Sequence, residues 1–252
     1  MGQAASSITK ENYDAVLLDL DGVITDTASL HAACWKEMFD GYLKAYAAQR
    51  GEAFRSFDIA LDYRLYVDGK PRFDGVRDFL TSRGITIPEG SHDDPASAET
   101  ISGLGNRKNE LVNRIIEDKG VQPYAGTVQF IHQLTDRGMK VAVVTSSQNC
   151  VSVLRAAKLA SLFDVVVDGN VIHERHLSGK PAPDTFLMAA NLLGVRPDRA
   201  VVVEDAISGV EAGVNGHFGL VIGVDRKGNS EELRQHGADL VVKDLSELVG
   251  PE

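Results

Sequence analysis

Five short runs along the chain are almost wholly apolar and rich in β-branched residues, without the strict alternation of a strand that has one wet face. Strands buried on both faces have this pattern. We therefore predict five strands in the interior of a sheet that is covered on both sides. The runs are Ala15–Leu20, Val141–Thr145, Val165–Val167, Ala200–Val203 and Leu220–Val224.

Between the later runs, apolar residues recur at helical spacing. The clearest helical segments are Thr127–Arg137, with Val128, Ile131 and Leu134 on one face, and Asp184–Leu193. Strands that alternate with helices of this length indicate βαβ units. The pattern thus predicts an α/β fold with a mainly parallel sheet.

The alternation stops after the first strand. From about Ala28 to Gly120 the pattern is helical, and two segments rich in Gly, Pro and Asp, Val67–Asp74 and Pro88–Pro95, interrupt it. The simplest explanation is a helical domain, residues 28–121, inserted into an α/β domain made of residues 1–27 and 122–252. Breakers near Thr25–Ala28 and Val121–Gly126 mark the expected hinges.

Charge and composition narrow the class of protein. The 36 acidic against 26 basic residues give a formal charge of −10, which argues against a nucleic-acid-binding protein but leaves a small anionic substrate open. No apolar run reaches the ~20 residues of a membrane helix, so we expect no membrane partner.

Two features favour a cytoplasmic location. Cys34 and Cys150 are too few for a disulfide framework, and we expect two unpaired thiols in a reducing compartment. Residues Met1–Asn12 lack the charged start and apolar stretch of a secretory signal, and we expect a frayed leader.

Acidic residues follow two of the predicted strands. Asp19 and Asp21 come directly after the first, and Glu204 and Asp205 after Val201–Val203. In a parallel sheet both pairs emerge at the same edge, where ligands of open α/β sheets bind. Converging carboxylates repel one another, and their hard oxygens favour Mg²⁺. Taken singly, a turn at the first pair and a helix cap at the second stay open.

Two further segments carry candidate phosphate-binding groups. Thr145, Ser146 and Ser147 end a strand with hydroxyls, beside the expected start of a helix. Lys180 precedes two prolines, which would hold it rigidly, although a solvated lysine in a turn is the alternative. Neither segment identifies a site alone.

Together and in this order, Asp-x-Asp-Gly, Thr145, Lys180 and Glu204-Asp205 resemble the haloacid dehalogenase superfamily of phosphoryl-transfer enzymes. Thr27, Ala28, His31 and Trp35 are similar to the β-phosphoglucomutase-like subfamily, as is Arg107-Lys108-Asn109. The resemblance implies a Rossmann-like core, a helical cap, Mg²⁺ and an aspartyl-phosphate intermediate. The inserted region is longer than that subfamily's cap, around Phe57–Asp74 and Ile85–Ala98.

The resemblance also implies roles for individual residues. Asp19 is the expected nucleophile and Asp21 the general acid/base, while Thr145 and Lys180 bind the transferring phosphoryl group. The expected Mg²⁺ ligands are the side chains of Asp19 and Asp205, the backbone carbonyl of Asp21, and Glu204 nearby. Further expected substrate-binding residues in the core are Ser146, Ser147 and Asn149.

The cap is expected to recognise the far end of the substrate. Arg77 and Lys108 are the candidates for a second phosphate, with a solvated helix face as the alternative for Arg77. Thr27 and His31 lie one helical turn apart, and His31 either positions Asp21 or couples to cap closure. Trp35 packs in the core or hinge, or lines the substrate cleft.

Two activities share every core residue named above. The favoured one interconverts β-glucose 1-phosphate and glucose 6-phosphate, which needs two phosphate sites. The alternative is a sugar-phosphate phosphatase, possibly acting on a disaccharide phosphate that the longer cap would accommodate. A non-catalytic binding protein is disfavoured because every core chemical position is filled. We expect a monomer in either case.

Overall fold

Residues 8–250 of the protein are described by a computed structural model, in which the chain divides into two compact units. The core unit ends its first segment at Asp26 and resumes at Val121, and the cap unit is Thr27–Gly120. The chain thus leaves the core unit once and returns once. Each crossing lies one residue before the boundary expected from the sequence.

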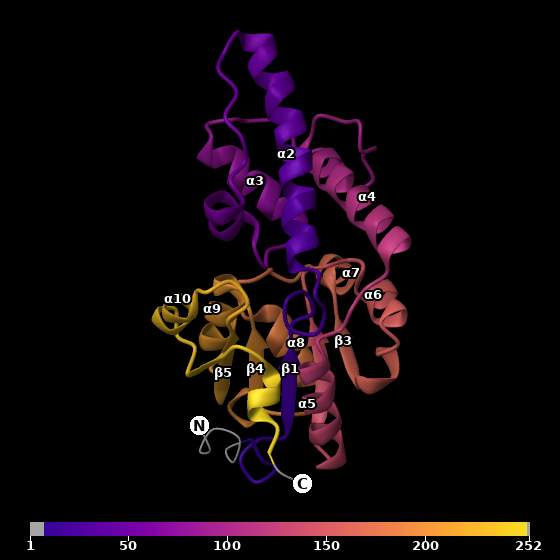
Figure 1. Cartoon of the computed structure of the whole chain (residues 1–252), viewed down its shortest axis with the longest axis vertical. Helices are drawn as coiled ribbons and strands as arrows, with labels where there is room; N and C mark the ends of the chain where they lie inside the picture. The colour runs from indigo at the N-terminus through magenta and orange to yellow at the C-terminus, as the bar shows by residue number, and fades with distance from the viewer. Residues whose placement is uncertain (1–7, 251–252) are drawn as a thin grey trace. The chain divides into compact units, whose positions relative to one another are not determined.

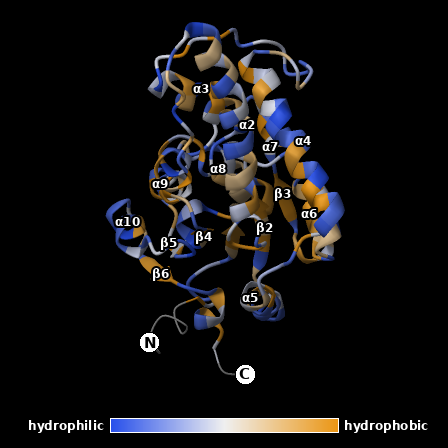
Figure 2. Ribbon diagram, turned by 45° about the horizontal axis from the view of Figure 1, so that its top comes forward, coloured by the Kyte–Doolittle hydropathy of each residue, from blue (hydrophilic) through white to orange (hydrophobic). Residues whose placement is uncertain are grey.

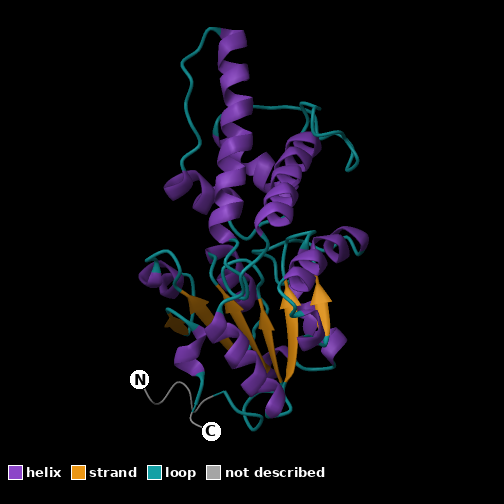
Figure 3. Ribbon diagram, turned by 45° about the vertical axis from the view of Figure 1, so that its right-hand side comes forward, coloured by secondary structure: helices purple, strands orange, loops and turns teal. Residues whose placement is uncertain are grey.

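A six-stranded parallel sheet forms the centre of the core unit, in the order β3-β2-β1-β4-β5-β6. Figure 3 shows all its strands pointing the same way. This arrangement confirms the predicted α/β class and places β1 between β2 and β4. The strands are β1 (Ala15–Leu18), β2 (Lys140–Val144), β3 (Val165–Val167), β4 (Ala200–Glu204), β5 (Leu220–Val224) and β6 (Leu240–Val242).

Helices cover the sheet on both faces (Figure 1). Helix α8 packs against β1, β2 and β3, α9 against β4 and β5, and α10 against β5 and β6, while α5 packs against β2. Figure 2 shows β2 and β3 in hydrophobic colours, as expected for covered strands. The helices are α5 (Ala125–Asp136), α6 (Cys150–Ala156), α7 (Gly169–Glu174), α8 (Asp184–Leu193), α9 (Ile207–Asn215) and α10 (Ser230–Gln235), with 3₁₀ turns η2 (Ala160–Leu162), η3 (Pro197–Arg199) and η4 (Leu245–Leu248).

The sheet differs from the sequence prediction at two places. Strand β6 was not predicted, because its three residues lie at the sheet edge and only Val242 is fully buried. Strand β1 ends at Leu18 rather than Leu20. The backbone N–H of Asp19 still bonds to Val203, and the chain then turns so that Thr25 bonds back to Leu20.

The cap unit is a small helical domain with an aromatic core. Ring centroids lie 5.3 Å apart for Trp35 and Phe39, 4.2 Å for Phe39 and Phe79, and 4.9 Å for Phe57 and Phe79. Such offset and edge contacts stabilise beyond their buried area. The elements are α2 (Ala28–Arg50), a π-helical segment η1 (Ile59–Val67), α3 (Arg72–Ser82) and α4 (Ile101–Lys119).

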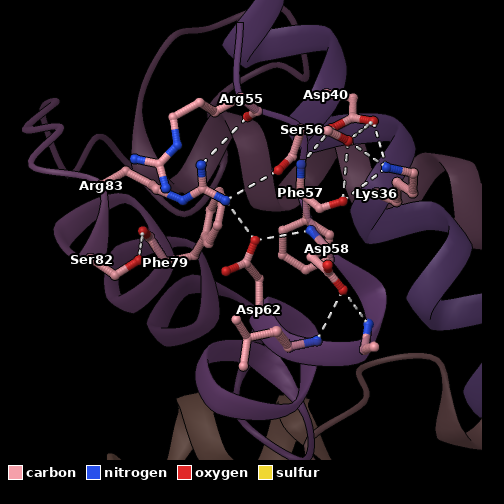
Figure 4. Close-up of polar contacts among 12 residues, drawn as sticks. Lys36, Asp40, Arg55, Ser56, Phe57, Asp58, Asp62, Phe79, Ser82 and Arg83 are labelled. Carbon is pink, nitrogen blue, oxygen red and sulfur yellow. Dashed lines mark hydrogen bonds and ion pairs between the residues drawn. The ribbon is translucent and has the colours of Figure 1, made fainter.

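Hydrogen bonds from α2 and from Arg83 hold the segment between α2 and η1 (Figure 4). Arg83 bonds Asp62 at 2.6 Å and reaches the carbonyl of Ser56 at 3.2 Å. Lys36 donates to Asp40 at 2.9 Å and to the carbonyl of Phe57 at 2.8 Å. This segment is therefore an ordered part of the cap fold.

One sequence expectation has bounds that are too wide, and another is wrong. The breaker expected at Val67–Asp74 is a turn of residues 68–71 between η1 and α3, and its last three residues already belong to α3. The expected frayed leader is ordered from residue 8: Ile8 is buried, and Arg199 donates to the carbonyls of Lys10 and Glu11. Residues 1–7 of that leader lie outside the described part of the chain.

Within residues 8–250, every helix is too short or too polar to cross a bilayer.

The aromatic core gives a stability prediction. Phe79→Ala removes a fully buried ring that contacts three other rings, and should cost about 3–5 kcal/mol of cap stability. The chain has one tryptophan, Trp35, in this cluster, so its fluorescence during urea unfolding reports on the cap. Leu192→Ala, at a side chain 52% exposed, is the control and should shift the midpoint little. Equal midpoints for both variants would contradict the assignment.

Candidate active site

Polar side chains gather at the carboxyl edge of the sheet. Asp19 follows β1, Thr145 follows β2, and Glu204 and Asp205 stand at the end of β4. The registers pair Leu18 with Val143 on one side and with Val203 on the other, so these residues leave the sheet at one level. The parallel topology thus brings together residues that are far apart in sequence.

A buried lysine joins two of the carboxylates. Lys180 Nζ lies 2.6 Å from Asp19 Oδ1 and 2.5 Å from Glu204 Oε1, and it donates to the carbonyl of Val144 at 3.1 Å. The Lys180 side chain is 1% exposed. Its three donors are therefore used by the ends of β1, β2 and β4, and its charge is neutralised inside the protein.

Asp205 is placed differently from its neighbour. Both oxygens of Glu204 are engaged, Oε1 by Lys180 and Oε2 by the backbone N–H groups of Asp205 and Ala206. The buried Asp205 Oδ2 accepts no hydrogen bond from the residues that the structure describes. Lys227 Nζ lies 3.2 Å from it, at ion-pair distance but without hydrogen-bond geometry, and is 30% exposed.

The cluster carries an excess of negative charge. Burial raises the pKa of Asp19 well above its usual range, and Lys180 only partly opposes this rise. Burial also raises the pKa of Glu204, again against the effect of Lys180. For Lys180 itself, burial disfavours the charged form, but Asp19 and Glu204 outweigh it and raise its pKa. The lysine is therefore charged, and two of the three carboxylates, Asp19 and Glu204, share it.

This donor set fits a divalent cation. Asp19, Glu204 and Asp205 each offer an oxygen, and these oxygens lie within 4.8 Å of one another. Hard oxygen donors, a negative excess and an unbonded buried carboxylate oxygen are what a cation such as Mg²⁺ requires. The cluster can thus hold a metal ion.

Asp21 lies in the tight turn that follows Asp19. Gly22 donates its N–H to the carbonyl of Thr25 at 2.8 Å, and Thr25 Oγ1 bonds the carbonyl of Leu20 at 3.2 Å. Asp21 is only partly buried, in contrast to Asp19. The turn therefore presents one covered and one more accessible carboxylate within three residues.

The loop after β2 is an ordered series of hydroxyls and amides. Thr145 Oγ1 accepts from the N–H of Ser147 at 3.1 Å, and Ser147 Oγ accepts from the N–H of Asn149 at 3.3 Å. Thr145 is buried, whereas Ser146, Ser147 and Asn149 are half-buried. All four stand at the same sheet edge as the carboxylates, a setting in which such donors bind anions.

Three expected cap residues meet inside the cap unit. Lys108 Nζ lies 2.8 Å from His31 Nδ1 and 5.0 Å from the centroid of the Trp35 ring, and all three are buried. Thr27 is also buried and accepts the N–H of His31 with its carbonyl. Trp35 packs on Phe39, so the packing alternative for this residue agrees with its surroundings.

The two arginines of α3 have opposite surroundings. Arg77 is bound on both edges, by Glu89 through two bonds of 2.9 Å and by Asp74 at 2.6 Å. Arg72 Nη2 donates to Asn106 at 2.7 Å, but its buried Nε and Nη1 find no acceptor in the described chain. Burial lowers the pKa of Arg72 to about 10. Arg72, unlike Arg77, therefore keeps two donors that form no hydrogen bond within the described chain.

Sequence reasoning missed Arg72, Arg226 and Lys227. Arg72 lies in a segment read as a breaker, and Arg226 and Lys227 follow β5 in an ordinary turn. The signal for the latter two is a polar run, Asp225 to Lys227, that follows a buried strand, as at the other strand ends. Arg72 differs from Arg77 through its contact with Asn106 and the absence of bound acids, and neither feature has a signal in the sequence.

Comparisons with known proteins agree with this geometry. A family model described as a haloacid dehalogenase-like hydrolase matches residues 13–217. A β-phosphoglucomutase of Mycobacterium bovis is 53% identical over 242 residues, covering 95% of this chain and 92% of that protein. A β-phosphoglucomutase of Bacillus subtilis is 30% identical over 235 residues, covering 93% and 91%.

A solved structure has the same fold. The crystal structure of a β-phosphoglucomutase from Clostridium difficile matches with a TM-score of 0.71, covering 94% of this chain and 93% of that one. At 24% identity, this likeness supports the fold, including its Rossmann-like sheet, rather than a particular substrate.

The position of Lys227 gives a prediction for metal binding. Lys227→Gln removes a positive charge 3.2 Å from Asp205 and should tighten Mg²⁺ binding about threefold to tenfold, the size of a partly exposed ion pair. Titration calorimetry of the purified protein with Mg²⁺ measures the change. The control is Lys243→Gln, at an exposed lysine on the same unit. Weaker binding in Lys227→Gln would show that the lysine supports the cation site.

Proposed function

This chain belongs to the haloacid dehalogenase-like hydrolase family, and from that membership we propose that it interconverts β-glucose 1-phosphate and glucose 6-phosphate. The resemblance seen in the sequence is thereby confirmed, as is the expectation of an enzyme that transfers a phosphoryl group on a sugar phosphate. The observation that carries the specific reaction is 53% identity to a β-phosphoglucomutase over nearly the whole of both chains.

Asp19 is the proposed nucleophile. A carboxylate oxygen of Asp19 attacks the phosphorus of a sugar bisphosphate, the phosphorus–oxygen bond to the sugar breaks, and an aspartyl phosphate forms. Lys180 holds the other oxygen of Asp19 at 2.6 Å, which fixes the direction of the attacking one. Because Lys180 is also fixed by Glu204, the nucleophile cannot rotate freely.

Asp21 is the proposed general acid/base. When Asp19 takes up the phosphoryl group, Asp21 gives a proton to the sugar oxygen that leaves. In the return step, Asp21 removes a proton from the sugar hydroxyl that attacks the aspartyl phosphate. Its partial exposure and its position two residues after the nucleophile support this division of roles. One fixed carboxylate and one accessible carboxylate in the same turn suit the two tasks.

Several groups are proposed to stabilise the negative charge of the phosphoryl group during transfer. Thr145 and the half-buried loop Ser146–Asn149 supply hydroxyl and N–H donors, and Lys180 supplies positive charge. Asp19, Asp205 and the backbone carbonyl of Asp21 would hold Mg²⁺, with Glu204 nearby. When bound, the ion offsets the repulsion between the carboxylates and the phosphate oxygens.

Arg72 is the proposed group for the second phosphate, replacing Arg77. Its planar fork has two unbonded nitrogens, and Asn106 fixes the third. Asn106 is itself anchored by bonds to the carbonyls of His92 and Asp94, so the arginine is preorganised. Lys108 stays a candidate, while its contact with His31 supports a role in arranging the cap.

A sugar-phosphate phosphatase is the second candidate. The matching family model is described as a hydrolase, and the core residues would serve equally if water accepted the phosphoryl group from Asp19. A disaccharide phosphate is its proposed substrate, on the expectation that extra chain around Phe57–Asp74 and Ile85–Ala98 makes the cap longer. The monomeric state and cytoplasmic location stay predictions for either activity.

The products formed from β-glucose 1-phosphate separate these two reactions. With β-glucose 1-phosphate, Mg²⁺ and a trace of glucose 1,6-bisphosphate, we expect glucose 6-phosphate to form with little free phosphate. Both products are followed in one reaction mixture by ³¹P NMR. Asp19→Asn, which keeps the shape of the nucleophile, should lower the rate by a factor of about a thousand or more. Free phosphate released in step with substrate loss would select the phosphatase instead.

A matched pair of variants tests the second phosphate site. Arg72→Ala should lower kcat/KM for β-glucose 1-phosphate by about 100-fold or more, because a charged hydrogen-bonding partner is lost. Arg77→Ala, on the same helix but with its fork already filled, should stay within about threefold. Steady-state kinetics on both proteins provide the measurement. The reverse ranking would restore Arg77 as the phosphate ligand.

A further inference from the structure

Arg226 lies in the loop between β5 and α10 and contacts three separate parts of the core unit. Its side chain is 14% exposed, and its contacts are to the catalytic turn, to Tyr124 and to the chain before η4. Nη1 donates to the carbonyl of Lys243 at 2.9 Å and to Asp244 Oδ2 at 3.0 Å. These two bonds anchor the guanidinium and leave Nε directed to the catalytic turn.

The first contact reaches the turn that carries Asp21. Arg226 Nε donates to the carbonyl of Gly22 at 3.0 Å. Gly22 has φ +89°, and a Cβ added there would lie 2.3 Å from Asp205 Oδ2, so the glycine backbone packs directly on that carboxylate. By holding the carbonyl of Gly22, Arg226 fixes the distance between the Asp21–Gly22 turn and Asp205.

The second contact reaches the segments by which the core unit connects to the cap unit. The Arg226 guanidinium lies 3.6 Å from the centroid of the Tyr124 ring. The Tyr124 hydroxyl donates to Asp26 Oδ1 at 2.9 Å, and its N–H bonds the carbonyl of Ile24 at 3.0 Å. Asp26 and Tyr124 belong to the outgoing and returning segments, so one side chain contacts both through a stacked ring.

We propose that Arg226 is a positioning residue for phosphoryl transfer, which holds the Asp21–Gly22 turn against Asp205 and ties that turn to both connecting segments. It touches neither the nucleophile nor its lysine, and acts through Gly22 and Tyr124. The proposal rests on the proposed function for its kinetic consequence, while its effect on the cation site follows from the Gly22–Asp205 contact alone.

The test compares Arg226→Met and Arg226→Lys with Arg196→Met, an exposed arginine paired only locally with Asp198. We expect kcat to fall about tenfold or more in Arg226→Met, with KM changed less than about threefold, and Arg226→Lys to lie between it and wild type. Calorimetry with Mg²⁺ alone should show binding weakened about fivefold or more in Arg226→Met. Arg196→Met should match wild type in both measurements.

Each outcome decides the proposal. Unchanged kcat and Mg²⁺ affinity in a folded Arg226→Met protein would overturn it and leave the arginine a purely structural role. If wild type converts no sugar phosphate, the proposed function fails, and the Mg²⁺ titration still decides for or against Arg226. If Arg226→Met does not fold, Tyr124→Phe is tested instead, because it keeps the ring that stacks on Arg226 and removes only the bond to Asp26. The proposal then requires a lower kcat and an unchanged Mg²⁺ affinity in Tyr124→Phe.

Discussion

The contact between Lys180 and the carboxylates of Asp19 and Glu204 is the interaction on which the site depends. An ammonium group this deeply buried is tolerated only when its charge and its donors are fully matched, and here two carboxylates and the Val144 carbonyl match them. These partners stand at the ends of three adjacent strands. The charge balance of the site therefore depends on the order of the strands in the sheet.

The same arrangement leaves an excess of negative charge at the carboxyl edge of the sheet. Two of the three carboxylates share one lysine, and Asp205 stands apart with a buried oxygen that lacks a hydrogen bond within the described chain. Burial of negative charge lowers stability, and a cost of this kind is typical of functional sites, in agreement with the proposed Mg²⁺ site. Glu204 therefore serves to orient Lys180, while Asp205 keeps free coordination capacity.

The parts of the protein that follow local rules could be predicted from sequence. The strand ends at Asp19, Thr145 and Glu204 were found because buried strands have a strong apolar signature and their carboxyl ends meet in a parallel sheet. Arg72 could not be distinguished from Arg77 in this way, since what separates them is a long-range contact with Asn106 and the acids that occupy Arg77. A short, half-buried edge strand such as β6 likewise gives no periodic signal.

The chain leaves the core unit and returns to it at two points that are far apart in sequence but lie side by side in space. The N–H of Asp26 bonds the carbonyl of Gln122 at 2.9 Å, and Thr25 and Pro123 form an isolated antiparallel bridge. An insertion whose two ends are paired in this way imposes almost no closure requirement on its host, so its length and content can change while the sheet stays as it is. The range of substrates can therefore change in such a protein when one continuous stretch of its gene is replaced, while the residues at the sheet edge stay the same.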